Sequence, residues 1–444
     1  MPSGQTLMQN ETDQVDVTVI GGGLAGMAAS IHLAEAGLRV LCIEADPVDS
    51  DPVGESLDWS APDLLKALGL PMEYLLEQGI ATYKLHVVLK LRDGSERAYI
   101  PGEWLGKPPY NVDLRTLHVD RSQLNQALRE IFLGKGIRLL SDRVVQVETA
   151  GRMVEAVVTA KGQRIASRWF LDASGSSASL FPRIFKLPVY EYGPHKVAMW
   201  DYFTVSESIE GTTLHADGAG PPYMDWVWQI PIHPNTISVG YVSPGEAVKE
   251  KRQRGLSVQD IFEAQLKQFP DLQGLSHDPA KEPPRTTSFR CRVFAGTAGP
   301  NWLVAGEAAA MVDPMTSNGV TAALRHSAEA SSLVIRYRNR PRIPRIPAAM
   351  YSQRVLSLGR FFNSAIENVL YDWPIRNRIG PFNAGDVYTI PAWSINVVYS
   401  RLRPQGFVST TLFRLLLASL RYSLWAFHWL CSRSRSSPPI AAAS

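Results

Sequence analysis

The chain has 444 residues, of which 45% are hydrophobic and 20% charged, a composition typical of a folded globular enzyme with two or three domains. Its three cysteines, Cys42, Cys291 and Cys431, are far apart in sequence, which argues against a disulfide framework and against a zinc or iron–sulfur site. The net charge of +3 is uneven, because fifteen arginines and three acids give residues 331–444 a charge of +12 and leave −9 for the first 330 residues.

The first predicted elements are a strand, a turn and a helix. Residues 1–16 form a polar lead-in without the apolar core of a signal peptide, so a cytoplasmic location is expected. Residues 15–21 are an apolar, β-branched run typical of a buried parallel strand. A helical stretch follows over 25–37, and residues 39–46 predict a second strand. Together they indicate a strand–helix–strand unit.

The turn of this unit carries a glycine motif. Gly21, Gly23 and Gly26 satisfy GxGxxG, in which the glycines allow a tight turn, close approach of a diphosphate and close helix–strand packing. The helix that follows would direct backbone N–H groups and its positive dipole end at phosphates. Glu44 ends the second strand, where an acid accepts hydrogen bonds from a ribose. The unit therefore predicts a dinucleotide cofactor.

Further along the chain, hydrophobic periodicity predicts alternating strands and helices. A β-hairpin is expected over 83–99 around Asp93-Gly94, and an aromatic-rich sheet over 201–242 that would cover a substrate cavity. The remaining predicted elements are a helix at 121–133, strands at 144–160, a helix at 257–268, a strand at 301–305 and a helix at 319–335.

The C-terminal quarter differs from the rest. Residues 336–347 contain five arginines and three prolines, which indicates a linker or surface loop. Residues 407–431 are apolar except for Arg414, Arg421 and His428, which lie on nearly one helical face. We expect this helix to lie on a membrane surface with Trp425 and Trp429 at the headgroups.

Two other positions remain open for this helix, namely docking on the protein's own core and spanning the bilayer. The two arginines disfavour a span, which needs about 20 apolar residues with few charges. A nucleic-acid partner is not expected, because the aromatic and basic residues follow a helical apolar period instead of forming a stacking groove.

Three later segments resemble motifs of the FAD-dependent monooxygenase superfamily. The segment 168–175 resembles the second flavin motif, a strand ending in Asp172 before small residues. The segment 301–309 followed by Asp313-Pro314 resembles the third, with Glu307 where aspartate is usual. Arg121 matches the basic residue near the flavin.

The resemblance implies FAD as cofactor and an α/β fold: a Rossmann-like FAD-binding domain, an antiparallel substrate-domain sheet and a helical C-terminal region. The FAD-binding domain is expected in three segments, 1–80, 118–183 and 291–340, and the substrate domain in two, 81–117 and 184–290. Residues 341–444 would form the basic helical region. A second GxGxxG is absent, so NAD(P)H would bind without a Rossmann unit, or a separate flavin reductase would deliver electrons.

Within this superfamily, the sequence resembles the flavin-dependent halogenases. Gly54-Glu55-Ser56 matches their GES segment, and residues 226–231 match their WxWxIP segment. Residues 313–320 resemble the loop that holds halide against backbone N–H groups. The resemblance implies that Glu55, Ser56 and Gly319 contact FAD, and that Trp226, Trp228, Ser317 and Asn318 face substrate or halide. Trp226 and Trp228 are alternatively one buried face of a strand.

The resemblance also implies a lysine that carries or orients the electrophilic halogen toward an aromatic substrate. Lys84 is the candidate catalytic residue, although no glycine follows it, and Lys90 is second. Without such a lysine, the same fold would serve a hydroxylase or epoxidase, or a reductase acting on a hydrophobic isoprenoid lipid. His86, His118 and His326 are possible acid–base groups, with structural roles as the alternative.

Overall fold

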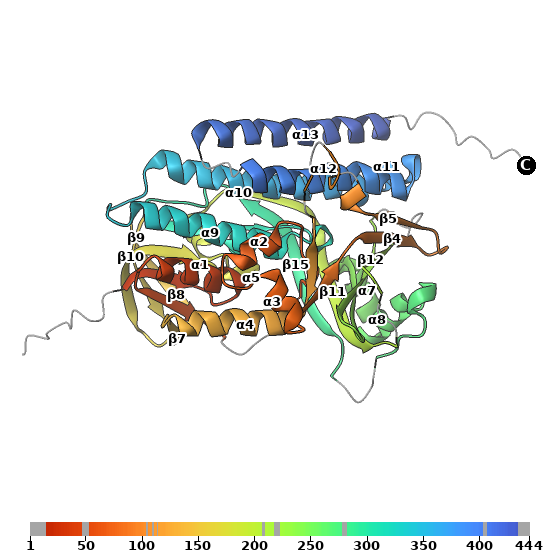
Figure 1. The fold of residues 1–444 in the computed structure, drawn as a ribbon, viewed down its shortest axis with the longest axis horizontal. Helices are drawn as coiled ribbons and strands as arrows, with labels where there is room; N and C mark the ends of the chain where they lie inside the picture. Colours follow the sequence, from red (N-terminus) through yellow and green to blue (C-terminus); the bar gives the residue numbers. More distant parts are fainter. Residues whose placement is uncertain are drawn as a thin grey trace, which may run out of the picture.

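The computed structural model describes residues 15–46, 53–103, 105–108, 111–112, 114–206, 209–216, 223–277, 282–402 and 406–433. The polar lead-in expected before residue 15 lies outside these ranges. The described chain folds into two large sheets with helices between and over them (Figure 1). The predicted α/β class is confirmed.

The first sheet is built around β1 (Val15–Ile20), whose β-branched residues Val17, Thr18, Val19 and Ile20 are buried. In the described residues it has seven strands in the order β7-β2-β1-β10-β9-β8, with β16 beside β10. β2, β7, β10 and β16 run parallel to their neighbours in its central part, whereas β8 and β9 are antiparallel. The bounds are β2 (Val40–Glu44), β7 (Arg138–Ser141), β8 (Val144–Ala150), β9 (Met153–Thr159), β10 (Arg164–Asp172) and β16 (Trp302–Val304).

Two long helices pack against each other on this sheet. α1 (Leu24–Glu35) follows the glycine turn and is buried along most of its length. α9 (Gly319–Tyr337) lies beside it, and the hydroxyl groups of Ser327 and Ser331 donate to the carbonyls of Ala25 and Ala29. α4 (Arg121–Gly134) also packs against α1, and Asp120 caps its first turn by accepting from the amides of Ser122 and Gln123. The three helices fix the position of the glycine turn.

The second sheet has eight strands in the described residues, in the order β17-β15-β11-β14-β13-β12-β4-β5. It is antiparallel except between β12 and β4. Along β13, Trp226, Trp228 and Ile230 face the C-terminal helices, while Val227 faces α7 and α8, as expected from strand alternation. The bounds are β4 (Val87–Leu91), β5 (Glu96–Tyr99), β11 (Val189–Thr204), β12 (Thr212–Ala216), β13 (Trp226–His233), β14 (Thr236–Pro244), β15 (Arg285–Phe294), β17 (Ala310–Met311), α7 (Gly245–Gln253) and α8 (Val258–Leu266).

The predicted hairpin over 83–99 is only partly correct. β4 and β5 form it, with Gly94 at φ +83° in the turn. Residues 83 and 84 instead belong to β3 (Ala81–Lys84), which pairs with β6 (Thr116–Val119) in a separate two-stranded sheet and places Lys84 opposite Thr116. A local alternation cannot distinguish these partners, because β6 lies more than thirty residues further along the chain.

The C-terminal region is helical, as predicted. α10 (Arg345–Ala365) continues into a π-helical turn, η6 (Ile366–Leu370), followed by α11 (Trp373–Ile379), α12 (Pro381–Leu402) and α13 (Phe407–Arg433). The basic linker is shorter than expected, since α9 ends at Tyr337 and α10 begins at Arg345. In Figure 1, α10, α11 and α12 form a layer over both sheets, and α13 lies on top of that layer.

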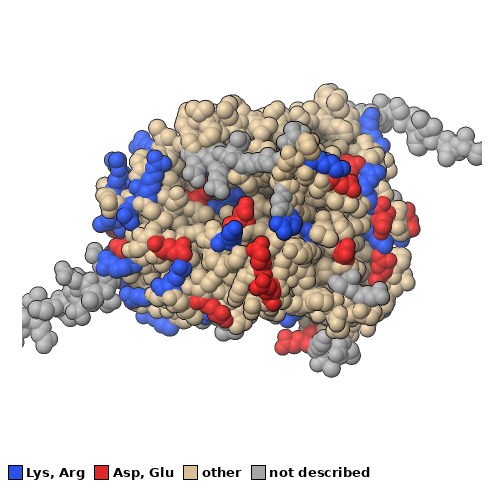
Figure 2. Space-filling model, in the orientation of Figure 1, with Lys and Arg blue, Asp and Glu red and all other residues tan. Residues whose placement is uncertain are grey.

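α13 docks on the protein's own core through one face, the alternative that the sequence left open. Phe413, Leu417 and Leu424 are buried in this contact, and His428 pairs with Asp372 at 3.0 Å. Its opposite face exposes apolar side chains: Phe407, Val408, Leu412, Leu415, Leu416, Tyr422, Trp425, Trp429 and Leu430. The edge of the molecule formed by α13 is accordingly mostly free of charged residues in Figure 2. None of the helices described has a stretch that is long and apolar enough for a bilayer crossing.

Shorter helical segments connect these elements. They are α2 (Ala61–Lys66), α3 (Met72–Glu77), α5 (Gly175–Ala178), α6 (Leu180–Ile184), η2 (Pro101–Glu103), η3 (Pro270–Leu272), η4 (Gly306–Ala308) and η5 (Pro314–Thr316).

Candidate active site

A cavity of about 700 Å³ lies between the two sheets and the C-terminal helices. At one end it is lined by residues of the first sheet and its helices, including Gly23, Arg121 and Ser176. The lining also includes Trp226 and Trp228 of β13 and Trp393 of α12. The cavity thus joins the predicted cofactor site to a chamber with aromatic walls.

The glycine turn has the close approaches that the motif predicts. Gly21 has φ +101°, and a Cβ there would lie 2.3 Å from the carbonyl oxygen of Ala173. A Cβ on Gly26 would lie 1.8 Å from the oxygen of Gly21, so the helix can approach the strand only with glycine at this position. Gly23, at the N-cap of α1, has open space within 4 Å. This opening, lined by α1 amides, fits a diphosphate.

Two charged residues flank the turn. The carboxylate of Glu44 accepts hydrogen bonds from the amides of Gly22 and Asp46, at the end of β2 where a ribose would lie. Arg121 is buried, and its Nη1 donates to the carbonyl of Val53 at 2.8 Å. Burial lowers the pKa of this guanidinium, and its Nε has no hydrogen-bond partner among the described residues. A buried donor facing the cavity is consistent with an anionic or carbonyl-bearing cofactor such as FAD.

The structure places the two acids of the later flavin motifs differently. Asp172 lies behind the cavity, where its oxygens accept from the amides of Ser174 and Phe181 and from the Ser174 hydroxyl. Asp172 therefore stabilises the 173–181 turn, and residues of that turn, including Gly175 and Ser176, line the cavity although Asp172 does not. Glu307 does line the cavity, and it accepts from the hydroxyl of Ser176 at 3.1 Å. Of these two residues, only Glu307 is placed to contact a ligand.

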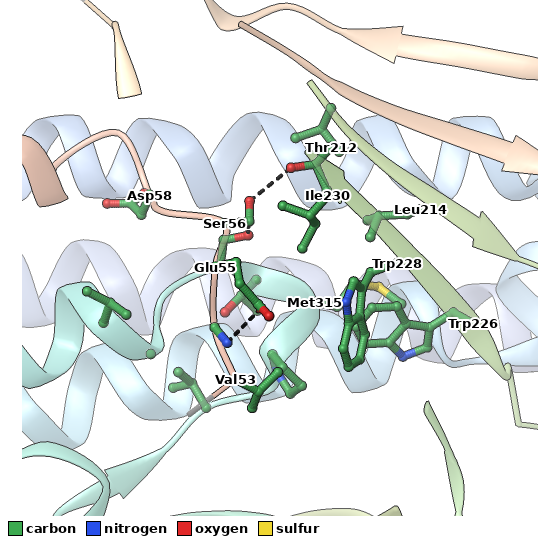
Figure 3. Close-up of a pocket in the computed structure, with 18 of the residues that line it drawn as sticks. Val53, Glu55, Ser56, Asp58, Thr212, Leu214, Trp226, Trp228, Ile230 and Met315 are labelled. Carbon is green, nitrogen blue, oxygen red and sulfur yellow. Dashed lines mark hydrogen bonds between the residues drawn. The ribbon is translucent and has the colours of Figure 1, made fainter. Parts of the chain in front are cut away.

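Glu55 connects the GES segment to the tryptophan strand. Its Oε1 accepts from Tyr202 at 3.2 Å and from the Ser238 hydroxyl at 3.1 Å. Ser238 in turn accepts from the indole of Trp228 at 3.0 Å. Glu55 is buried at the cavity wall and lies opposite Trp228 in Figure 3. The carboxylate therefore fixes the ring of Trp228 through one hydroxyl group.

Trp226 and Trp228 both line the cavity and also form one buried face of β13. A place beside the ligand space and a place in the buried strand face are therefore compatible. Their ring centroids are 5.9 Å apart. Gly240 lies opposite Trp228 on β14, and a Cβ there would lie 2.1 Å from the indole. The indole of Trp226 donates to the hydroxyl of Tyr371 at 2.9 Å. Both rings are thereby held as rigid apolar walls.

The 313–320 segment meets the GES segment at the cavity. Ser317 has φ +55°, and its hydroxyl donates to that of Ser56 at 3.3 Å. Ser56 also bonds Thr212 at 2.9 Å (Figure 3). Ser317 and Gly319 line the cavity, whereas Asn318 lies behind it, and its amide donates to the carbonyl of Thr316. Within the turn, the amide of Ser317 donates to the carbonyl of Pro314 and that of Asn318 to the hydroxyl of Thr316, so the turn is held by its own hydrogen bonds where it borders the cavity.

Lys84 lines the cavity and is 3% exposed. Its Nζ donates to the carbonyl of Leu57 at 2.9 Å and lies 5.4 Å from the ring centre of Trp59. Burial lowers the pKa of this ammonium to about 8, and the nearby Asp58 carboxylate partly opposes the effect. Lys84 is thus a buried lysine in the chamber whose ammonium loses its proton more readily than that of a solvated surface lysine.

The other candidate groups lie elsewhere. Lys90 forms ion pairs with Asp271 and Glu96 and does not line the cavity. His118 is buried and bonds Thr212 at 2.8 Å, and burial keeps its pKa well below the usual value. Burial also lowers the pKa of His326, to about 4, so both imidazoles are neutral at physiological pH.

Sequence reasoning missed an ion network behind the 313–320 segment. Lys196 of β11 is buried and contacts Asp313 at 2.6 Å and Glu367 at 2.9 Å. Tyr371 donates to Asp313 at 3.1 Å, which connects this network to Trp226. A lone lysine on a strand gives no signal of such pairing, because its partners come from segments more than 100 residues away.

The C-terminal wall of the chamber was also missed. Trp393 of α12 packs edge-on against Trp59, with ring centroids 5.3 Å apart. Tyr99 of β5 and Tyr388 of α12 lie beside it in the cavity lining. The sequence of α12 was assigned only to a helical region, since a mixed apolar pattern does not specify which residues face a ligand.

Comparison with protein families gives two matches. The model of the tryptophan halogenase family matches residues 110–337, and that of FAD-dependent oxidoreductases matches residues 16–181. The chain is 26% identical over 348 residues to the flavin-dependent halogenase armH5 of Armillaria mellea, covering 72% of this chain and 64% of that relative. Four curated relatives are matched over only 59% to 64% of their own length.

Two further similarities extend these matches. The chain is 25% identical to a 1H-pyrrole-2-carbonyl-[peptidyl-carrier protein] brominase of Pseudoalteromonas luteoviolacea, covering 73% of this chain and 78% of that protein. Its fold is similar to that of the flavin-dependent brominase Bmp2, with a TM-score of 0.70, 18% identity and coverage of 92% and 100% of the two chains.

Proposed function

Because this chain belongs to the tryptophan halogenase family, we propose that it is an FAD-dependent halogenase that uses reduced flavin and O2 to halogenate an aromatic or hydrophobic substrate. The observation that carries the proposal is the position of Lys84, buried in the cavity between the predicted flavin site and the tryptophan chamber. The chemistry that FAD would supply when bound is the oxidation of halide at the expense of O2. Gly21, Gly23 and Gly26 would admit its diphosphate, and Glu44 its ribose.

In this proposal the chain's own residues confine and direct the oxidised halogen. The 317–319 turn, of which Ser317 and Gly319 line the cavity, would hold halide at the flavin end. The Lys84 ammonium donates a hydrogen bond to hypohalous acid and orients its halogen toward the substrate. The aromatic C–H is replaced by carbon–halogen, the oxygen leaves as water, and the displaced proton completes that water. Trp226, Trp228 and Trp393 hold the ring and exclude solvent.

The test is product formation from a panel of phenols, pyrroles and prenylated quinones, with reduced FAD, O2 and either chloride or bromide. We expect halogenated product from the native chain, and none from Lys84→Ala, which should still bind FAD. Lys90→Ala is the matched control and should retain activity, because Lys90 lies outside the cavity. Hydroxylated product formed at a rate independent of halide would refute halogenation and favour a monooxygenase.

The electron source is a separate part of the proposal. The described chain has one glycine turn of the dinucleotide-binding type, and the cavity beside it is shared with the substrate chamber. We expect a separate flavin reductase to supply reduced FAD. Adding NADPH to the FAD-loaded chain should then leave the flavin absorbance unbleached until a reductase is added. Rapid bleaching by NADPH alone would assign the reduction to this chain.

We also propose that α13 attaches the enzyme to the cytoplasmic face of a membrane. Its outward face combines leucines with Tyr422 and Trp425, and the exposed Arg414 lies on the same helix. Aromatic and basic side chains around an apolar strip are typical of interfacial helices. A surface-bound enzyme would suit an apolar substrate dissolved in the bilayer.

Truncation would expose the core beneath α13, so point substitutions are the better test of attachment. The variant Leu412→Ser/Leu415→Ser/Trp425→Ser should lose sedimentation with phosphatidylglycerol vesicles, whereas Leu133→Ser, at an exposed leucine of α4, should not. Equal sedimentation of both variants would exclude this role for α13.

A further inference from the structure

Asp58 is a buried carboxylate with an unusual set of partners. It lies between the GES segment and α2 and is 3% exposed. Its Oδ1 accepts from the amide and hydroxyl of Ser60, and from Thr321 of α9 at 3.4 Å. Its Oδ2 accepts from the Asn396 side chain at 2.7 Å. Donors from three separate segments therefore converge on this one carboxylate.

Asn396 belongs to α12 and is 1% exposed. The same amide nitrogen that donates to Asp58 donates to Asn318 at 2.9 Å. Its Oδ1 has no hydrogen-bond partner among the described residues. Asn396 thus joins the segment before α2 to the 313–320 turn through its two N–H bonds, and it offers an unused acceptor beside them.

Asp58 and Lys84 are held next to each other by the backbone. Lys84 donates to the carbonyl of Leu57, the residue that precedes Asp58. Thr116, which lies opposite Lys84 in the β3–β6 pair, donates to the carbonyl of Asp58 at 2.9 Å. Burial lowers the pKa of Lys84, and the charge of Asp58 acts in the opposite direction.

A further charged group, Arg325 of α9, lies on the side of Asp58, where its Nη2 donates at 3.0 Å to the Ser60 hydroxyl that itself donates to Asp58. His118 on β6 and His86 after β3 lie on the side of Lys84, and burial holds His118 neutral. Tyr388 of α12 faces Asp58, and burial keeps its pKa well above the usual value, so it is neutral as well. Among the described residues, Asp58 is the anion that faces Lys84.

We propose that Asp58 is a positioning residue that acts as the buried counter-charge of Lys84, keeping it an ammonium, and that α12 holds Asp58 in this role through Asn396. The inference deepens the proposed function, because an ammonium is the form that donates to hypohalous acid. The coupling of the two charges, however, can be measured without turnover.

The experiment is a pH titration of lysine 13Cε chemical shifts in the full chain with oxidised FAD bound, with the Lys84 signal identified by its loss in Lys84→Arg. In Asp58→Asn the pKa of Lys84 should fall by about one unit or more. Asp63→Asn, the same change at an exposed site on α2, should leave it unaltered. An unaltered pKa in folded Asp58→Asn overturns the proposal. If this variant does not fold, Asp58→Ser carries the same expectation, since it adds no competing N–H donor.

A charge swap tests the part assigned to α12. In Asp58→Asn/Asn396→Asp, the amide at 58 can donate to the new carboxylate at 396, so a negative charge returns to the same pair. The pKa of Lys84 should regain at least half of the fall seen in Asp58→Asn. If the pKa of Lys84 does not rise again, the role assigned to Asn396 is overturned. If the pKa of Lys84 changes as expected in these variants but the native chain forms no halogenated product, the proposed function is contradicted. The coupling between Asp58 and Lys84 is supported in that case.

Discussion

At the scale of single residues, two lysines of similar sequence context lie in opposite environments. Lys84 is enclosed by Trp59 and the Leu57 carbonyl, whereas Lys90 is paired with acids outside the cavity. The sequence named both lysines and preferred Lys84, which is the one of the two that lines the cavity. It could not supply the burial, which depends on the pairing of β3 with β6.

Burial of Lys84 should make folding stability rise with pH. Its pKa is about 8 in the folded chain against 10.5 for an exposed lysine, so between these values the unfolded chain binds more protons. Stability is therefore reduced below pH 8 and recovers toward pH 10.5, by at most about 3 kcal/mol. Denaturant unfolding at pH 7 and pH 10 should show this gain in the native chain and in the exposed-site control Lys249→Met. It should vanish in Lys84→Met, and persistence there would assign the effect to another group.

The glycines at 23 and 26 should respond differently to alanine. Gly23→Ala meets no protein atom within 4 Å, so it should keep the native melting temperature and weaken FAD binding at least tenfold by crowding the diphosphate. Gly26→Ala would clash with the oxygen of Gly21 and should lower stability. Melting curves and FAD titration separate the two effects, with Gly134→Ala in α4 as the control. Native FAD affinity in Gly23→Ala would place the cofactor elsewhere.

At the scale of elements, strands and helices with strong local signals were predicted, and those defined by distant partners were not. β1 and α1 follow from a β-branched run and a glycine turn. The two strands of the 83–99 segment that form a hairpin were found, but β3 was assigned to it because its alternation resembles theirs. The buried face of α12 could not be predicted, since the partners of the buried Asn396, Asp58 and Asn318, come from distant segments of the chain.

The ion network of β11 should anchor the turn before α9. Lys196→Met would leave the carboxylates of Asp313 and Glu367 facing each other without a cation. Removing one partner from a buried pair costs about 3–5 kcal/mol, so urea unfolding should shift by this amount. Lys267→Met, at an exposed lysine of the second sheet's helical cover, should change stability by less than about 0.5 kcal/mol. A similarly small change in Lys196→Met would mean that this ion network contributes little to stability.

At the scale of the whole molecule, the chamber depends on parts of the chain far apart in sequence. The GES segment, β13 and α12 each provide one wall, and the chamber closes only when the C-terminal helices lie over the sheets (Figure 1). The sequence predicted the first two walls from motifs. For the C-terminal helix it favoured a membrane surface and left docking on the core as the alternative, because the arginine-rich composition conceals the residues that face inward.

Trp393→Ala should therefore alter substrate choice without altering FAD binding. Loss of the indole enlarges the chamber beside Trp59, so bulkier aromatic substrates should gain in kcat/KM relative to small ones. Product analysis on paired small and large phenols measures this ratio. Trp373→Ala, at a partly exposed position of α11, provides the comparison. An unchanged ratio in Trp393→Ala would remove α12 from the wall that selects substrate.

Three side chains spaced along one face of α12 have a mechanical consequence. Trp393 lines the chamber, and the side-chain amide of Asn396 donates to Asp58. Tyr399 packs against Phe413 of α13, with ring centroids 5.1 Å apart. These residues are three apart, so a rigid helix transmits any displacement of one to the others. A displacement of α13 would consequently reach both Asp58, which faces Lys84, and the aromatic wall, so the packing of the two outermost helices bears on the buried charges and on the shape of the chamber together.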